Sequence, residues 1–558
     1  MIQERTKDIA RSAPAALFLL GVALLLTWPT AWELGVMIPG HPMSDAAEHL
    51  QGSWWFSREL AAGRLPLETR LTHWPPGGAL WYVDPLGALL AWPLQGFGPL
   101  AAFSLAVIVQ VWAGLLAAYI LARFEGADRH GAVAGALVYG ASGYVMSLLY
   151  IGTTEYLNLA ALPLYWIALR LALRHGGKWI VAAGVLGAWA TLGAAYYGAF
   201  AALLTGIALV VEPGGEWRRR LARAWGVGLV LVGLAGPGLA LAWSTLHADD
   251  AVIQAATAPG WTPGSLPAID LRTFFWPGGY YFPDNRAVGN AGIIHVNYLG
   301  WAAILAAAWR LRHMGEGRRA ALLGLLLAMV LAAGPTLCVS GHLPRLGGAT
   351  IPLPAAILYY LPLFSMIHHP YRLVVLPLVL LVPLVARAVT GWRAWLLGAL
   401  VLAETLWLSP AVFPIPTLKV EVPASVLALP EGGIWELPPE FHTANRAYTA
   451  AQVLHGRVIP YGVNQFLPPA WRANHWVRSV LKCLKLEKRS IGRDGGPPAP
   501  SFGPADPLEV GAGLVAWKDA GYRHVVLHLD AVNPAERHCL ELRLGAGRLV
   551  DRVELFSP

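Results

Sequence analysis

Residues 44–82, SDAAEHLQGSWWFSRELAAGRLPLETRLTHWPPGGALWY, concentrate charge between two long apolar stretches. Only 13% of the chain is charged, so this density beside a membrane indicates a loop with a specific purpose. Asp45, Glu48 and His49 stand at i, i+3 and i+4, which places them on one face if the segment is helical. The run HWPPGG at 73–78 cannot continue a helix, because its prolines fix φ and its glycines free the backbone. The stretch therefore predicts a short acidic helix followed by a rigid aromatic turn.

The composition of the 558-residue chain excludes a single soluble domain. Apolar residues make up 56% of it, whereas globular chains are about 45–50% apolar and about 25% charged. The net charge of +8 comes from short basic clusters between apolar stretches, where the positive-inside rule places them. The charge therefore reports membrane topology, and we expect no nucleic-acid partner.

A membrane span needs about 20 apolar residues, and the sequence offers eleven candidates. They are 12–33, 98–122, 131–150, 157–174, 179–194, 196–212, 225–244, 294–309, 320–338, 371–389 and 393–409. The run 179–211 is either two short spans or one long tilted span, and parity favours two. The first span follows basic residues but is expected to remain as an uncleaved anchor, since ten more follow it.

The basic residues set the predicted orientation. With the N-terminus inside, the cytoplasmic loops hold the Arg and Lys residues at 123, 129, 170, 174, 178, 218–220, 223, 310, 312, 318, 319, 387 and 393. The loop 34–97, the loop 247–293, the stretch 338–370 and everything after 408 then face outward. Segments 84–100 and 352–367 are apolar but broken by Pro and Gly, which favours interfacial helices on the outer leaflet.

The composition changes after Ser409, where prolines and short alternating apolar runs begin. Residues 522–529 predict a strand, and 492–507 a loop rich in Pro and Gly. The fold class is therefore an α-helical polytopic membrane protein, 1–409, with a small extracytoplasmic α/β domain, 410–558. Cys338, Cys483 and Cys539 have no metal-ligand or CxxC spacing. Cys483 and Cys539 could pair if their domain faces an oxidising compartment, or stay reduced.

Several short motifs resemble a known family. They are Asp45 with Glu48, the Pro-Pro-Gly turn at 75–77, EYLN at 155–158, LFSMIHHPYR at 363–372, and Tyr448, Gln452 and HGR at 455–457 in the tail. Together they resemble the GT-C fold polytopic membrane glycosyltransferases, and within them the YfhO-like bacterial branch. The resemblance implies transfer of a sugar from a polyprenyl-phosphate-linked donor to a glycan, lipid or protein acceptor, at the outer face of the bacterial plasma membrane. His368 stands where relatives would carry Arg.

The opening loop holds the candidate catalytic residues Asp45 and Glu48. Sugar transfer to a hydroxyl needs a carboxylate that accepts the acceptor proton or holds a metal on the leaving phosphate. Asp45, Glu48 and His49 are also a candidate site for Mg²⁺ or Mn²⁺. The alternative is structural, because Asp is a favoured cap for the helix that follows.

The other candidates are binding residues. Arg70, His73, His368, His369 and Arg372 are expected to contact the donor phosphate, since guanidinium binds phosphate through paired hydrogen bonds. Contact with lipid headgroups alone explains them equally. Tyr448, Gln452 and His455 are expected on the acceptor side, although any folded domain contains such residues. The middle loop adds the charged residues Asp249, Asp250, Asp270, Arg272, Asp284 and Arg286, and an aromatic run at 274–281.

Two other classes of protein stay open. A transporter or lipid flippase carries ionisable groups at mid-membrane, but here the polar residues lie near the span ends, with Gln110 and Glu404 as the main exceptions. A non-catalytic envelope assembly protein would tolerate loss of Asp45. The chain has no P-loop, GxGxxG or GxSxG motif, so ATP-driven, dinucleotide and serine-hydrolase chemistry lack support.

Overall fold

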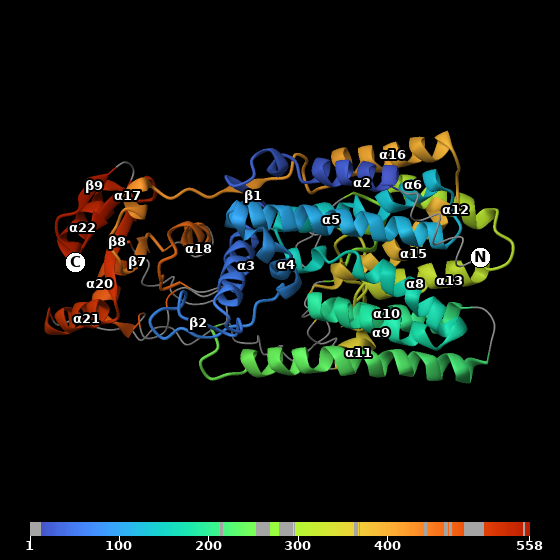
Figure 1. The fold of residues 1–558 in the computed structure, drawn as a ribbon, viewed down its shortest axis with the longest axis horizontal. Coiled ribbons are helices and arrows are strands. Elements are labelled where there is room, and N and C mark those ends of the chain that lie inside the picture. The colour runs from blue at the N-terminus through green and yellow to red at the C-terminus, as the bar shows by residue number, and fades with distance from the viewer. Residues whose placement is uncertain are drawn as a thin grey trace. The chain divides into compact units, whose positions relative to one another are not determined.

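The computed structural model describes residues 13–212, 216–252, 268–277, 294, 296–361, 367, 369–439, 444–461, 467, 471, 473–484, 507–550 and 553–557. It is mostly helical and divides into two compact units (Figure 1). The first unit contains Met1–His49, Val83–Leu241 and Ala256–Leu418, and the second contains Leu50–Tyr82, Ala242–Ala255 and Lys419–Pro558. The boundary between the units falls inside helix α3 (Ala46–Ala61), so the opening loop contributes residues to both.

The first unit holds the apolar helices. They are α2 (Ala13–Leu26), α4 (Pro85–Ala91), α5 (Pro99–Phe124), α6 (Arg129–Gly140), α7 (Gly143–Ile151), α8 (Ala161–His175), α9 (Lys178–Gly193), α10 (Ala195–Val211), most of α11 (Trp217–Leu246), α12 (Trp301–Arg312), α13 (Arg318–Ala332), α15 (Val375–Ala386) and α16 (Trp392–Leu408). Helix α6 packs against α5, α15 and α16, while α9 packs against α8 and α10 (Figure 1).

Short elements connect these helices. The 3₁₀ helices are η1 (Thr30–Trp32), η2 (Trp92–Phe97), η3 (Thr154–Leu157), η4 (Leu271–Phe274), η5 (Pro354–Tyr360) and η6 (Pro370–Val374). Strand β1 (Met37–Pro39) pairs with β6 (Thr417–Lys419), and β4 (Arg345–Leu346) pairs with β5 (Ala349–Thr350).

Two described helices, α5 and α11, are long and apolar enough to cross a membrane, and α6 with α7 makes a third candidate bent by 43°. Helix α5 has 26 residues, which gives it a length of about 39 Å at 1.5 Å per residue. That length exceeds the roughly 30 Å hydrocarbon core. Each predicted span coincides with a helix or helix pair, and 179–211 forms two helices, α9 and α10, as parity favoured. The count of eleven spans stays a prediction.

The break between α6 and α7 positions the loop that follows. The Ser142 hydroxyl donates to Tyr139 O (2.9 Å) and accepts from Val145 N (3.4 Å), so it both closes α6 and caps α7. Helix α7 ends at Gly152, whose φ of +72° is a left-handed conformation. A Cβ at Gly152 would lie 2.5 Å from the side chain of Ala46. Glycine therefore lets the start of α3 approach η3 closely.

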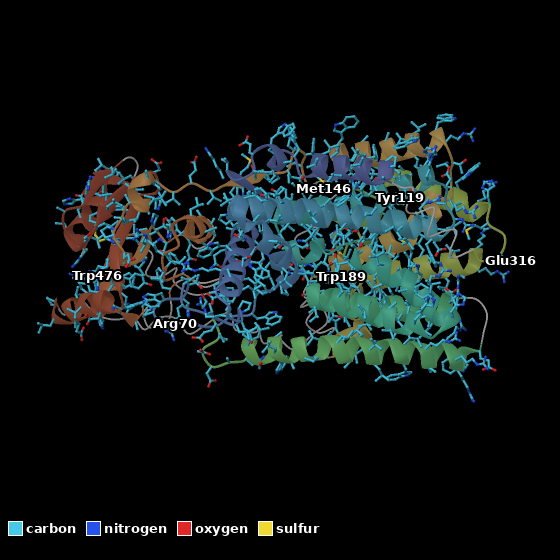
Figure 2. All side chains as sticks on the ribbon, viewed as in Figure 1. Arg70, Tyr119, Met146, Trp189, Glu316 and Trp476 are labelled. Atoms are coloured by element: carbon cyan, nitrogen blue, oxygen red, sulfur yellow. A yellow bond between two sulfur atoms is a disulfide. The ribbon has the colours of Figure 1, made fainter. Side chains whose placement is uncertain are left out.

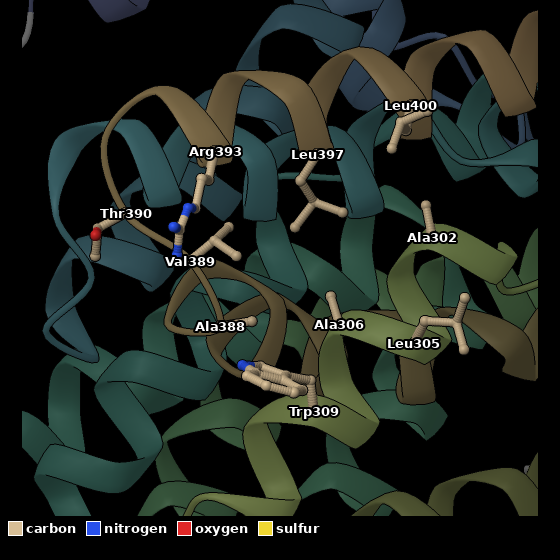
Figure 3. Close-up of a pocket in the computed structure, with 10 residues that line it drawn as sticks. All are labelled: Ala302, Leu305, Ala306, Trp309, Ala388, Val389, Thr390, Arg393, Leu397 and Leu400. Atoms are coloured by element: carbon tan, nitrogen blue, oxygen red, sulfur yellow. The ribbon is translucent and has the colours of Figure 1, made fainter.

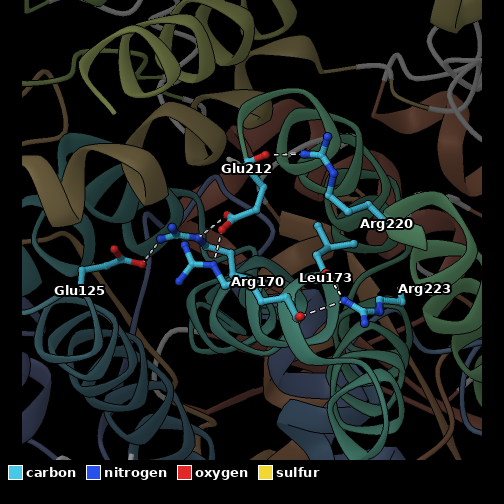
Figure 4. Close-up of polar contacts among 7 residues, drawn as sticks. Glu125, Arg170, Leu173, Glu212, Arg220 and Arg223 are labelled. Carbon is cyan, nitrogen blue, oxygen red and sulfur yellow. Dashed lines mark hydrogen bonds and ion pairs between the residues drawn. The ribbon is translucent and has the colours of Figure 1, made fainter. Parts of the chain in front are cut away.

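Arginines bind carboxylates at the ends of α5, α8 and α10 (Figure 4). Arg170 forms ion pairs with Glu125 and with Glu212, whose Oε2 lies 2.8 Å from Arg170 Nε. Arg174 also pairs with Glu212, and Arg223 donates to the carbonyl oxygens of Leu173 and Arg174 at 2.7 and 2.8 Å. Because Glu212 is buried, losing its cations would leave a costly isolated charge.

Glu404, the polar residue predicted within the last span, has a structural role. Its carboxylate accepts hydrogen bonds from the Tyr298 hydroxyl and from the amides of Trp301 (2.7 Å) and Ala302 (3.1 Å). These amides belong to the first turn of α12, where a negative charge is favourable. Glu404 therefore caps α12.

The second unit is built on a mixed four-stranded sheet with the order β7-β8-β10-β9. The strands are β7 (Gly433–Leu437), β8 (Tyr522–His528), β9 (Arg548–Val550) and β10 (Val553–Phe556), and the helices α17 (Ala424–Leu427), α18 (Ala444–His455), α20 (His475–Cys483), α21 (Pro507–Asp519) and α22 (Pro534–Leu544) accompany them. Strands β7 and β8 are parallel, and β10 runs antiparallel to β8 and β9. The strand predicted over 522–529 is confirmed as β8, which the 3₁₀ helix η7 (Leu529–Ala531) follows.

Aromatic side chains fill the core of this unit. Trp517 stacks on Tyr522 with a centroid distance of 3.9 Å. Trp435 and Trp476 pack beside Trp517, and Figure 2 labels Trp476 in this unit. A disulfide joins Cys483 of α20 to Cys539 of α22, so the pairing that the sequence left open is present.

The aromatic turn of the opening loop belongs to the same core. Here β2 (Glu68–Thr69) pairs with β3 (Gly78–Ala79), and the turn between them carries Trp74. The carbonyl oxygen of Trp74 accepts hydrogen bonds from Trp471 Nε1 (2.8 Å) and the Tyr522 hydroxyl (2.9 Å). Its own indole donates to Ala520 O at 2.5 Å. The predicted helix and rigid turn are thus confirmed, and the turn packs into the fold of the tail.

Candidate functional site

Asp45 stands immediately before α3 and is half-buried. Its carbonyl oxygen accepts from the amides of Glu48 and His49, each at 3.0 Å, and its own amide donates to Ile151 O at 3.0 Å. These bonds fix Asp45 between the first turn of α3 and the end of α7. Asp45 therefore occupies the position of a helix cap, and this structural role is compatible with a catalytic role for its side chain.

Four buried side chains form a contact series, in which two links are hydrogen bonds and the third is an ion-pair contact. Asp84, the cap of α4, accepts from Gly87 N (2.8 Å) through one oxygen and from the Thr154 hydroxyl (2.6 Å) through the other. Thr154 Oγ1 also lies 3.1 Å from His49 Nδ1. His49 Nε2 lies 3.3 Å from Glu155 Oε2. The series therefore runs Asp84–Thr154–His49–Glu155 and links α3, α4 and η3.

The series fixes where protons can sit. If Asp84 is ionised, the only hydroxyl hydrogen of Thr154 points at it, and His49 Nδ1 must then donate to Thr154. One proton is then shared between His49 Nε2 and Glu155. Burial raises the pKa of Asp84 to about 6 and that of Glu155 to about 7, the second against the opposing charge of Arg372. Near neutral pH these carboxyl groups can gain or lose a proton.

Arg372 is a buried cation surrounded by tyrosines. Its guanidinium carbon lies 3.8 Å from the Tyr156 ring centroid and 5.3 Å from that of Tyr196. Its Nη1 donates to the Tyr156 hydroxyl and its Nε to the Tyr371 hydroxyl, the latter at 3.2 Å. Among the described residues, no carboxylate lies within ion-pair distance of Arg372. A buried charge of this kind needs an anionic partner.

Asp45 and Arg372 share one electrostatic environment. The Asp45 carboxylate interacts with Glu155 and with Tyr371, and Arg372 acts on Glu155 as well. The structure thus brings Asp45, His49 and Arg372 into one region, although Arg372 lies more than 300 residues after Asp45 in the sequence. An acid and a buried cation that both act on Glu155 suit a reaction in which a hydroxyl loses a proton and a phosphate leaves.

Of the other predicted phosphate residues that the structure describes, only His369 is observed beside a residue that contacts Arg372. Arg70 and His73 belong to the second unit. Arg70 is exposed and lies 3.7 Å from Glu68 Oε1, while His73 N donates to Tyr461 O at 2.9 Å. His369 packs edge-on against Tyr371 at 6.0 Å. His368 falls outside the described residues, and the phosphate roles of all four stay predictions.

The predicted acceptor residues lie on α18. Gln452 is fully buried, and its Nε2 donates to Leu71 O (2.7 Å) and Arg457 O (2.9 Å). Tyr448 stacks on His528 at 5.0 Å. His455 Nδ1 accepts from Arg457 N at 3.1 Å, and burial lowers the pKa of His455. These contacts hold the unit together, while an acceptor role stays a prediction.

No metal site is formed by the part of the chain that the structure describes. No three His, Cys, Asp or Glu side chains there are arranged to hold an ion, and this includes Asp45, Glu48 and His49. His49 instead bonds Thr154 and Glu155.

The middle-loop candidates are dispersed. Asp249 and Asp250 are exposed in the second unit. Asp270 is buried in the first unit and accepts from Arg272 Nη2 and Gly341 N, each at 2.7 Å. Burial opposes its ionisation, but these hydrogen bonds prevail and lower the pKa of Asp270. Asp284, Arg286 and residues 278–281 of the aromatic run lie outside the described residues.

Sequence reasoning missed several members of the site. Glu155 and Tyr156 stand only in a motif of resemblance. Asp84 and Tyr196 belong to segments predicted to be interfacial or spanning, and Thr154 lies between two predicted spans. A usable signal was present: Glu155 and Asp84 are acids at the ends of strongly apolar segments, where a charge is costly and usually functional.

Three solved structures resemble the fold. The arabinofuranosyltransferase AftD from mycobacteria aligns with a TM-score of 0.52 at 15% identity, over 98% of this chain and 40% of AftD. A variant of AftD gives a TM-score of 0.53 at 16% identity, over 98% and 41%. ArnT from Cupriavidus metallidurans, solved with undecaprenyl phosphate, aligns with a TM-score of 0.44 at 15% identity, over 99% of this chain and 98% of ArnT.

The AftD likeness confirms the GT-C fold that the sequence resemblance implied, while the YfhO-like branch stays a prediction. This chain spans about two fifths of the AftD chain. No family model matches the sequence, and no curated protein matches it.

Proposed function

We propose that this protein is an integral membrane glycosyltransferase that moves a sugar from a polyprenyl-phosphate-linked donor to an acceptor on the extracytoplasmic face. The observation that carries the proposal is Arg372, a buried guanidinium without a carboxylate partner among the described residues, in the same electrostatic environment as Asp45. The fold is that of AftD, which is an arabinofuranosyltransferase.

In this mechanism Arg372 binds the donor phosphate and stabilises the charge that grows on it as the bond to the sugar breaks. Asp45 accepts the proton of the attacking hydroxyl. The His49–Glu155 pair lies behind Asp45 and can take up a proton near neutral pH. Tyr156 and Tyr371 hold the guanidinium in place, so a lipid phosphate meets an already oriented cation.

The disulfide supports the proposed side of the membrane. Cys483–Cys539 lies in the second unit, and disulfides persist mainly in oxidising compartments such as the periplasm. The odd number of predicted spans, with a cytoplasmic N-terminus, leads to the same orientation for the tail.

The test is transfer by purified protein from a panel of labelled polyprenyl-phosphate sugars, comparing wild type with Asp45→Asn. Asn keeps the shape and caps a helix as well as Asp, so folding should hold while the rate falls on the order of 10²-fold or more. Glu48→Gln is the matched control, and a chelator tests for metal dependence. Turnover of Asp45→Asn within about twofold of wild type would leave only the cap role.

A further inference from the structure

A groove with a volume of about 580 Å³ runs between α12 and α16 (Figure 3). Its walls are apolar and include Leu305 from α12 and Leu397 and Leu400 from α16. Thr390 and Arg393 lie at the end where the α15–α16 connection closes it (Figure 3). The groove thus has a long apolar part and one polar, cationic end.

The apolar wall is open to the surroundings. Leu305 is 64% exposed, Trp309 58% and Leu400 52%. A continuous apolar face of this kind marks a surface that meets lipid or a partner. Both helices coincide with predicted spans, so an acyl chain is the apolar group that this wall would meet.

Two further arginines outside the groove lining add positive charge near Arg393. Arg387 ends α15 and Arg310 lies in the last turn of α12. Burial lowers the pKa of Arg310, and the charge of Arg387 lowers it further, so these two cations lie close enough to repel each other. Among the described residues, no carboxylate lies within ion-pair distance of Arg310, Arg387 or Arg393.

The acid that bonds the α15–α16 connection already has two backbone partners. Asp128 precedes α6. One carboxylate oxygen accepts from Gly131 N (2.7 Å) and the other from Gly391 N (3.2 Å), and Gly391 stands two positions before Arg393. Its carboxylate caps α6 and holds the α15–α16 connection. The three arginines therefore leave a net positive field over one end of an apolar groove.

We propose that this groove binds an anionic phospholipid, with the phosphate on Arg393 and the Thr390 hydroxyl and an acyl chain along Leu305, Leu397 and Leu400. A guanidinium and a hydroxyl are suitable phosphate donors. Arg310 and Arg387 favour a lipid with net negative charge over a zwitterionic one. The arginines lie in predicted cytoplasmic loops, and anionic lipids of that leaflet are attracted to basic segments beside the membrane. The site is independent of the proposed transferase chemistry.

Native mass spectrometry of the full chain in detergent tests the proposal. Phosphatidylglycerol and phosphatidylcholine with the same acyl chains are titrated separately, and retained lipid is measured. Wild type should retain phosphatidylglycerol at least fivefold more strongly than phosphatidylcholine. Arg393→Gln should remove most of this preference, whereas Arg312→Gln, which changes an exposed arginine of α12 outside the groove lining, should keep it.

A second variant tests the apolar part. Ala306→Phe places a ring in the groove lining, and it should reduce retention of phosphatidylglycerol while leaving Arg393 intact. Equal retention of the two lipids by wild type, or equal losses in Arg393→Gln and Arg312→Gln, would overturn the proposal. Displacement of phosphatidylglycerol by an equimolar polyprenyl phosphate would also overturn it, because the occupant would then be an isoprenoid phosphate.

Discussion

At the scale of single residues, Arg372 gives the proposal its most direct test. Lys keeps the charge but cannot bond Tyr156 and Tyr371 while presenting a planar fork to phosphate. We expect Arg372→Lys to weaken donor binding about 10-fold or more, the effect of one lost charge-assisted hydrogen bond. Titration with a polyprenyl-phosphate sugar measures this, with Arg312→Lys, an exposed arginine outside the groove lining, as the control. An unchanged titration at normal expression would show that Arg372 does not bind the donor.

Glu155 predicts how stability depends on pH. Burial raises its pKa from 4.5 to about 7, so the folded protein holds this proton more tightly than the unfolded chain does. The resulting stability is fully present below about pH 4.5 and is lost as pH rises through about 7. A shift of this size corresponds to about 3 kcal/mol.

Thermal unfolding in detergent between pH 5 and 8 checks this. Wild type should unfold at lower temperature as the pH rises, and Glu155→Gln, which cannot ionise, should flatten that dependence. Asp84 contributes a similar but smaller trend below pH 6, since burial raises its pKa to about 6. Parallel pH curves for wild type and Glu155→Gln would mean that Glu155 does not ionise in this range.

The sequence could nominate Asp45 as a candidate but could not assemble its surroundings. Asp45 stands in a charged segment between apolar spans, and this position makes it a candidate from composition alone. These surroundings come from tertiary packing, because Arg372 of η6 bonds the Tyr156 hydroxyl of η3, and the start of α3 approaches Gly152 closely. Glu155 lies in an apolar context that reads as a span end, and only the structure pairs it with His49.

At the scale of elements, the helices followed from hydrophobic runs, while their ends depended on local chemistry. The predicted span 131–150 is two helices, because the Ser142 hydroxyl bonds to both sides of a break. The loop 50–82 was expected with the membrane spans, but the carbonyl oxygens of Leu71 and Trp74 accept hydrogen bonds from Gln452 Nε2 and Trp471 Nε1 of the tail. Such long-range backbone bonds have no periodic signal in the sequence.

Helix α18 offers a test that separates structure from acceptor binding. Gln452 donates to Leu71 O and Arg457 O and accepts from Gln51 Nε2 at 3.2 Å. Gln452→Leu removes these three hydrogen bonds and leaves the buried Gln51 amide without this acceptor, which costs about 1–3 kcal/mol. We expect a fall in the unfolding temperature of the second unit. A variant that unfolds normally but shows a raised KM for acceptor would instead establish an acceptor role.

At the scale of the whole molecule, the two compact units hold different groups of elements and residues. The first holds the apolar helices together with Asp45, Glu155 and Arg372, and the second holds the sheet, the aromatic core and the disulfide. The structural likeness to AftD covers 98% of the chain and therefore includes both units.

Topology is therefore the prediction on which the whole arrangement depends. Eleven spans and a cytoplasmic N-terminus put everything after Leu408 outside, and the Arg and Lys clusters agree. A reporter that is active only in the cytoplasm, fused after Pro558, should stay silent, and one that requires export should be active. The same cytoplasmic reporter fused after Arg312 should be bright, because that loop is predicted to be inside, and it controls for expression.

The disulfide gives an independent measurement of the same orientation. Cys483 and Cys539 should resist thiol labelling in intact cells and become reactive only after reduction, whereas Cys338 is a buried thiol. A bright cytoplasmic reporter after Pro558, together with thiols at both positions that label without reduction, would place the second unit inside. The span count would then be even, and the proposed outer-face chemistry would have to be abandoned along with it.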